Sequence, residues 1–137
     1  MSMTLSTPPS SAPAASRVNV ADSDLCAVVC AASAGVHAAL IPPHAHESTR
    51  LAVAFSLATV ALVAAAVALS REPSPAVSAA VGVLLLAVAA AYFLSRTTGI
   101  PGLTQHQEPF DPVGVVISLL ELAAAFVAVR QPNPRRH

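Results

Sequence analysis

Long apolar segments separated by short polar ones dominate the chain. Four such segments cover residues 24–41, 51–69, 76–94 and 113–129, and nearly every charged residue lies between them. A helix needs roughly 20 mostly apolar residues to cross the ~30 Å hydrocarbon layer of a bilayer, and each segment is close to that length. The pattern therefore predicts an all-α protein, a four-helix transmembrane bundle.

Composition leads to the same prediction independently of the segments. The chain is 55% hydrophobic and only 10% charged, whereas soluble domains are roughly 25% charged. The formal net charge is zero, so there is no electrostatic reason to expect nucleic acid as a partner. We expect the lipid bilayer to surround the protein, and other membrane proteins or further copies of this chain to bind it.

The two ends of the chain differ from the apolar segments. Residues 1–16 are mostly Ser, Thr, Pro and Ala without a charge, and such a composition cannot bury enough apolar surface to offset the entropy of ordering. We therefore expect a disordered cytoplasmic tail over 1–22, a transmembrane bundle over 23–131 and a short basic C-terminal tail over 132–137. A cleaved signal peptide is the alternative for the first apolar segment, but the positive cluster that should precede it is missing.

Capping residues and prolines predict where the helices begin and end. Ser74 and Asp111 each precede a proline. Serine and aspartate are good N-cap residues, and proline is tolerated at the first helical position because its missing N–H would have no intrahelical partner there. Pro42 and Pro43 are expected to end the first helix, because proline removes a donor and clashes with the preceding turn. The short connection 70–75 predicts that the second and third helices form an antiparallel hairpin.

The arginines predict the orientation in the membrane, because positive charge is retained on the cytoplasmic side. With an even number of spans, five arginines share the side of the termini and two lie on the other side. We expect a multi-pass protein of the cell membrane with both termini in the cytoplasm. The first group is Arg17, Arg71, Arg130, Arg135 and Arg136, and the second is Arg50 and Arg96.

Small and polar residues recur at helical spacing along one face of each of two segments. Such faces point into a membrane bundle, because small residues permit close approach of helices and polar ones avoid lipid. The second and third segments have weaker versions of this stripe. The four stripes are Cys26, Cys30, Ser33 and His37; Gly114, Ser118, Glu121 and Ala125; Ser56 and Thr59; and Ser78 and Gly82.

Glu121 is the residue that most needs an explanation. It lies eight residues into the last segment, or roughly 12 Å along the axis, near the middle of the bilayer. A carboxylate facing lipid there costs at least ~2.5 kcal/mol, so it must face inward, pair or stay protonated. His37 is the expected partner, and Arg96 is the other group that would compensate the charge. These three residues form either a structural link between the first and last helices or a site for proton relay or substrate binding.

Histidines near the outer ends of the helices suggest a metal site. His44, His46 and His106, with acidic residues close to them in the sequence, offer the ligands that Zn²⁺ or Cu²⁺ accepts. Their spacing matches no closed structural site, so ordinary loop histidines are the alternative. Cys26 and Cys30 lack the spacing of a redox motif and are expected to be small packing residues.

Several short stretches resemble small four-helix membrane proteins of high-GC Gram-positive bacteria. They are 35–39 (Gly-Val-His-Ala-Ala), 95–102 (Ser-Arg-Thr-Thr-Gly-Ile-Pro-Gly), Glu108-Pro109 and Glu121-Leu122. The resemblance implies a four-span bundle and draws attention to His37, Arg96, Glu108 and Glu121. It implies no particular activity.

The sequence contains no recognisable catalytic or nucleotide-binding motif, so we do not expect an enzyme. The leading hypothesis is a non-catalytic accessory or structural subunit of a membrane complex. The first alternative is a proton-coupled small transporter that uses Glu121 and His37, which would require oligomerisation because four short helices enclose little volume. The second is an outer-face metal-handling protein that uses His44, His46 and His106.

Overall fold

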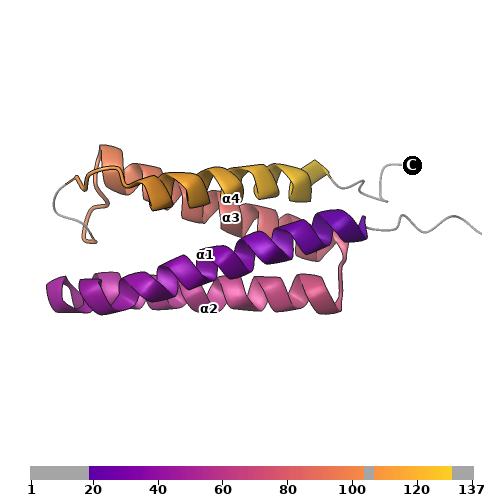
Figure 1. Cartoon of the computed structure of the whole chain (residues 1–137), viewed down its shortest axis with the longest axis horizontal. Helices are drawn as coiled ribbons and strands as arrows, with labels where there is room; N and C mark the ends of the chain where they lie inside the picture. The colour runs from indigo at the N-terminus through magenta and orange to yellow at the C-terminus, as the bar shows by residue number, and fades with distance from the viewer. Residues whose placement is uncertain (1–18, 104–106, 131–137) are drawn as a thin grey trace, which may run out of the picture.

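The protein is a bundle of four long helices. A computed structural model describes residues 19–103 and 107–130, and the regular structure within these ranges is helical: α1 (Val20–Glu47), α2 (Thr49–Arg71), α3 (Pro75–Thr97) and α4 (Pro112–Arg130) (Figure 1). All four helices are long and apolar enough to cross a membrane. The predicted all-α transmembrane bundle is confirmed. The predicted C-terminal tail (132–137) and most of the predicted N-terminal tail (1–22) lie outside the described residues. α1 begins at Val20, inside the range that was expected to be the N-terminal tail.

The helices alternate in direction, so the two ends of the described chain lie at the same end of the bundle (Figure 1). We call this the terminal end. We call the opposite end the connection end, because the segments that connect α1 to α2 and α3 to α4 lie there. α2 and α3 are antiparallel neighbours in the chain, as predicted, but the most extensive packing is within two other pairs, α1 with α2 and α3 with α4.

The predicted helix caps are present. The Ser74 hydroxyl accepts a hydrogen bond from the Val77 N–H (3.2 Å), and Asp111 Oδ1 accepts one from the Gly114 N–H (2.6 Å). Each bond satisfies one of the N–H groups that a helix start leaves without an intrahelical partner. α3 and α4 therefore begin at the proline that follows each cap.

The prediction that Pro42 and Pro43 end the first helix is wrong. α1 contains both prolines and continues to Glu47. Its 28 residues span ~42 Å, which exceeds the ~30 Å hydrocarbon layer, so the last turns extend past it. The carbonyls that lose their donors belong to Ala38 and Ala39, which are exposed, and water at the membrane edge can hydrate them.

All four helices pack together in the half of the bundle near the terminal end. A continuous cluster of buried small and aliphatic side chains fills this half, and Leu62 and Leu85 at its centre are fully buried. Many other large apolar side chains along all four helices are exposed, as expected for helices surrounded by lipid. The cluster consists of Cys26, Val29, Cys30, Ala34, Leu62, Ala65, Leu69, Val81, Leu85, Ala124, Ala125 and Ala128.

Gly82 allows α3 and α4 to approach each other closely. A Cβ atom at this position would lie 3.2 Å from Val129 Cγ2, 3.3 Å from Ala128 Cβ and 3.4 Å from the Ala125 carbonyl oxygen. Gly35, in α1, is a natural comparison, because a Cβ there meets nothing within 4 Å.

We predict that Gly82→Leu lowers the free energy of unfolding by about 1–3 kcal/mol, because the added side chain overpacks the α3–α4 contact. Gly35→Leu should leave stability unchanged or raise it, since leucine has the higher helix propensity. Thermal unfolding in mild detergent measures both. Equal behaviour of the two variants would contradict close packing at Gly82.

Candidate functional site

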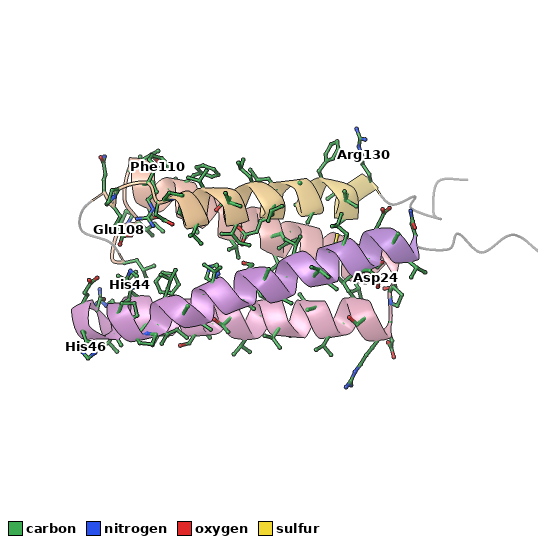
Figure 2. All side chains as sticks on the ribbon, viewed as in Figure 1. Asp24, His44, His46, Glu108, Phe110 and Arg130 are labelled. Atoms are coloured by element: carbon green, nitrogen blue, oxygen red, sulfur yellow. The ribbon has the colours of Figure 1, made fainter. Side chains whose placement is uncertain are left out.

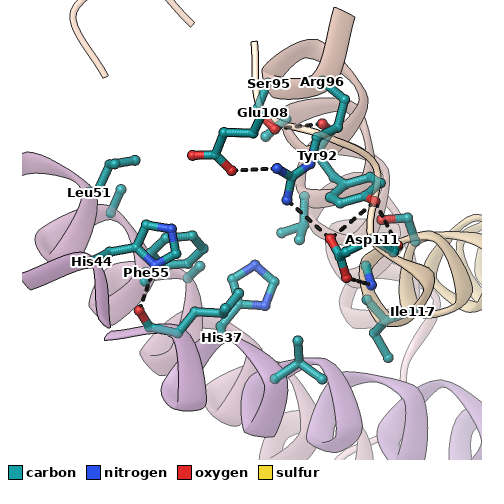
Figure 3. Close-up of a pocket in the computed structure, with 18 of the residues that line it drawn as sticks. His37, His44, Leu51, Phe55, Tyr92, Ser95, Arg96, Glu108, Asp111 and Ile117 are labelled. Atoms are coloured by element: carbon teal, nitrogen blue, oxygen red, sulfur yellow. Dashed lines mark hydrogen bonds and ion pairs between the residues drawn. The ribbon is translucent and has the colours of Figure 1, made fainter. Parts of the chain in front are cut away.

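A cavity of about 520 Å³ opens in the half of the bundle near the connection end, between the α1–α2 pair and the α3–α4 pair. Known ligand pockets have volumes of roughly 300–1,000 Å³. A single chain therefore encloses enough space for a small molecule, contrary to the expectation that four short helices would need further copies. Figure 3 shows His37, His44 and Phe55 on one side of this space and Tyr92, Arg96 and Asp111 on the other.

Glu121 lies at the inner end of the cavity, above the tightly packed half. Its side chain is 1% exposed, so the prediction that it faces inward is confirmed. The Ser33 hydroxyl on α1 donates a hydrogen bond to Oε1 of the carboxyl group. The second oxygen, Oε2, is buried and has no hydrogen-bond partner. Half of a buried, cavity-lining carboxyl group is thus left unsatisfied by the protein.

The expected direct pairing of Glu121 with His37 is not present, because Ser33 lies between them. His37 Nδ1 is 2.9 Å from the Ser33 carbonyl oxygen and 3.4 Å from the Ser33 hydroxyl. A ring nitrogen this close to a carbonyl oxygen carries the hydrogen, which leaves Nε2 as the acceptor of the neutral ring. Ser33 belongs to the predicted α1 stripe and sits one turn nearer to Glu121, so it reaches the carboxyl group first.

Arg96 does not compensate Glu121 but organises the rim of the cavity. Its guanidinium group forms ion pairs with Glu108 and, at 3.2 Å, with Asp111, and it lies 4.9 Å from the centre of the Tyr92 ring. The Tyr92 hydroxyl in turn donates to the Asp111 carbonyl oxygen (3.2 Å). Asp111 is therefore both a helix cap and a partner of Arg96. These bonds join the end of α3 to the start of α4 beside the cavity mouth.

Two of the histidines predicted to bind metal lie on opposite sides of α1 (Figure 2). His44 and His46 are two residues apart on a helix, which separates them by about 200° around its axis. His44 Nδ1 is 2.8 Å from the Leu40 carbonyl oxygen, and its ring centroid lies 4.8 Å from that of Phe55. His46 is exposed. The predicted arrangement, in which the two histidines share one loop, is wrong because α1 does not end at its prolines.

The metal hypothesis now depends on His106, which lies outside the described residues. Within residues 19–103 and 107–130, no group of three or more His, Cys, Asp and Glu side chains could hold a metal ion. The set formed by His44, His46 and His106 with Zn²⁺ or Cu²⁺ stays a prediction.

The cavity lining is electrically negative by formal charge. It includes three carboxyl groups and one guanidinium group, those of Glu108, Asp111, Glu121 and Arg96. Sequence reasoning singled out Glu121 and Arg96 but gave Ser33 only a place in the inward-facing stripe of the first helix and assigned Asp111 the role of a helix cap. Phe55 and Tyr92 carried no signal in the sequence, because isolated aromatic residues are common in apolar helices.

Comparisons of the chain with models of protein families, with curated proteins and with solved structures each give no match.

We predict that Ser33→Ala lowers the free energy of unfolding by about 1–3 kcal/mol, because both oxygens of the buried Glu121 carboxyl group then lack a donor. Ser56→Ala is the matched control, since the Ser56 hydroxyl donates to the Ala52 carbonyl oxygen of its own helix (2.8 Å). Thermal unfolding in detergent should separate the two variants. Equal stability would show that the Ser33–Glu121 bond does not hold α1 to α4.

Proposed function

We propose that this protein is a small carrier of the cell membrane that binds a small molecule in the cavity and couples its movement to a proton on Glu121. The observation that carries the proposal is the state of the Glu121 carboxyl group. One oxygen accepts a hydrogen bond from Ser33, and the other is buried beside the cavity without a partner. Ionisable groups inside a membrane mark substrate or proton pathways by default.

A purely structural role explains this arrangement less well. Buried polar groups in native proteins are nearly always hydrogen-bonded, and an unsatisfied one costs about 1–3 kcal/mol. A carboxyl group kept only to join α1 to α4 would be expected to use both oxygens. An oxygen that is buried without a partner, on a side chain that lines a cavity, is instead suited to receive a ligand group or a proton.

A route for protons supports the coupling. His37 lies next to Ser33 on the cavity wall, and Ser33 contacts Glu121, so imidazole, hydroxyl and carboxyl groups follow one another into the bundle. The other titratable or charged groups among the described residues of the lining are His44 from α1, Tyr92 and Arg96 from α3, and Glu108 and Asp111 before α4. Cys30 on α1 also interacts electrostatically with Glu121. From α2, the cavity lining contains only apolar side chains.

Transport through this cavity requires that its closed side opens. The packed half of the bundle separates Glu121 from the terminal end. Many carriers expose a fixed site to the two sides of the membrane in turn by rocking one group of helices against another. The α1–α2 and α3–α4 pairs are the two bodies that would rock, since packing within each pair is the most extensive in the bundle.

The proposal includes the orientation and assigns no catalytic step. Both termini are cytoplasmic, because Arg71 and Arg130 at the terminal end are accompanied by three more arginines in the two tails. The cavity therefore opens toward the outside. A non-catalytic subunit of a membrane complex is the function that would replace the carrier if the flux experiment below fails.

The orientation is tested with single cysteines in a Cys26→Ser, Cys30→Ser background. We expect a reagent that cannot cross the membrane to label His46→Cys and His106→Cys in intact cells and to leave Asn133→Cys unlabelled. Labelling of Asn133→Cys alone would reverse the orientation.

The carrier function is tested in proteoliposomes that contain a pH-sensitive dye. We expect at least one member of a panel of small organic cations, anions and neutral solutes to drive proton movement through the wild-type protein. Glu121→Gln, which keeps a hydrogen-bonding group but cannot release a proton, should abolish the flux. Glu72→Gln, at an exposed position at the terminal end, should not. A panel in which no solute moves protons overturns the carrier.

A further inference from the structure

We propose that the ligand of the cavity is an amphiphilic organic cation, a quaternary or protonated amine with an apolar body, whose charged group lies beside Glu121. This inference names the substrate class of the site described above and rests on the assignment of that cavity as a binding site. Charge, aromatic lining and the unpartnered carboxyl oxygen each point to this class.

The charges of the lining favour a cation and oppose an anion. Arg96 is the one guanidinium group of the lining, and two carboxylates at the rim, Glu108 and Asp111, already neutralise it. Glu121 adds a further carboxyl group at the inner end. A ligand that carries negative charge would meet uncompensated carboxylates in a medium of low dielectric constant, where repulsion is strong.

The unpartnered oxygen of Glu121 gives the cation a specific position. Oε2 is buried and has no donor from the protein, while Oε1 is held by Ser33. A protonated amine would donate a hydrogen bond to Oε2, and a quaternary ammonium group would pair with it by charge alone. The first supplies the hydrogen bond that the protein does not, the second compensates the charge of the carboxylate, and either would compete with a proton for this site.

Aromatic rings line the path to Glu121. The Phe55 ring packs against His37 and His44, with centroid distances of 5.7 and 4.8 Å, and Tyr92 lines the opposite side. The faces of such rings attract ammonium groups. The remaining lining is largely aliphatic, with Leu51, Ile100 and Ile117 among its residues, and suits an apolar body rather than a hydrated metal ion.

The chain contains a built-in reporter for binding. Tyr92 is its one tyrosine and there is no tryptophan, so intrinsic fluorescence excited near the tyrosine band comes from a residue that lines the cavity. The probes are hexyltrimethylammonium, hexanesulfonate and hexanol, which share an alkyl body and differ in charge. Each is titrated into the full-length protein in mild detergent.

We expect hexyltrimethylammonium to change the Tyr92 fluorescence to saturation and to bind at least about tenfold more tightly than the sulfonate or the alcohol. Glu121→Gln should weaken binding of the cation by about tenfold or more, and Glu72→Gln should not change it. Phe55→Leu, which keeps an apolar side chain but removes the ring, should weaken it about threefold. The unfolding temperature of each variant is measured first, and the Phe55→Leu result stands independently if Glu121→Gln does not fold.

Equal binding of the sulfonate, an unchanged affinity in Glu121→Gln, or the absence of saturable binding by the cation would each overturn the inference. The outcome is separable from that of the flux experiment. Proton movement driven only by anions or neutral solutes would retain the carrier and reject the cation. Saturable, Glu121-dependent binding of the cation without flux in proteoliposomes would retain the site and reject transport.

Discussion

The Glu121 carboxyl group has to be satisfied inside the bundle, because a carboxyl group that faces lipid at the middle of a transmembrane helix is costly. The Ser33 hydroxyl meets this requirement for one oxygen only. The bond sets α1 against α4 at a defined depth, just above the layer of small side chains that closes the terminal half of the bundle. The location of the cavity, its chemistry and the proposed coupling to protons all depend on this contact.

The two halves of the bundle differ because different kinds of residues fill them. In the terminal half, Cys26, Cys30, Gly82 and Ala128 allow the helices to approach until Leu62 and Leu85 fill the remaining space. In the other half, the rings of His37, His44, Phe55 and Tyr92 and the side chain of Arg96 stand between the helix pairs. In this half the two helix pairs leave a space between them, and these side chains line it (Figure 3).

Ion pairs and hydrogen bonds of two arginines stabilise the rim of the cavity. Arg96 is bound by Glu108 and Asp111 and stacked near Tyr92, and Arg50 on α2 donates to the Gly102 carbonyl oxygen (3.2 Å) across the bundle. Positive charge at this end is thus used to secure the connection between α3 and α4. Because the rim arginine is already neutralised, the carboxyl group of Glu121 determines which ligand charge the interior accepts.

The sequence by itself determined the four spans, the caps at Ser74 and Asp111 and the inward direction of the polar stripes on α1, α3 and α4, because these follow from segment length and from the period of a single helix. On α2, the predicted stripe residues Ser56 and Thr59 are only half-buried and donate to carbonyl oxygens of their own helix, and apolar residues line the cavity instead. The sequence did not determine which residues of two facing stripes would contact each other. His37 was the expected partner of Glu121, but Ser33 is the residue that contacts it. Sequence reasoning also failed at Pro42 and Pro43, where local propensity ends a helix but the position beyond the hydrocarbon layer lets the helix continue. Only the tertiary structure decided the partner of Arg96, the uneven packing of the two halves and the cavity itself. These depend on the relative depth and rotation of four helices, which arise from side-chain packing between segments far apart in the chain.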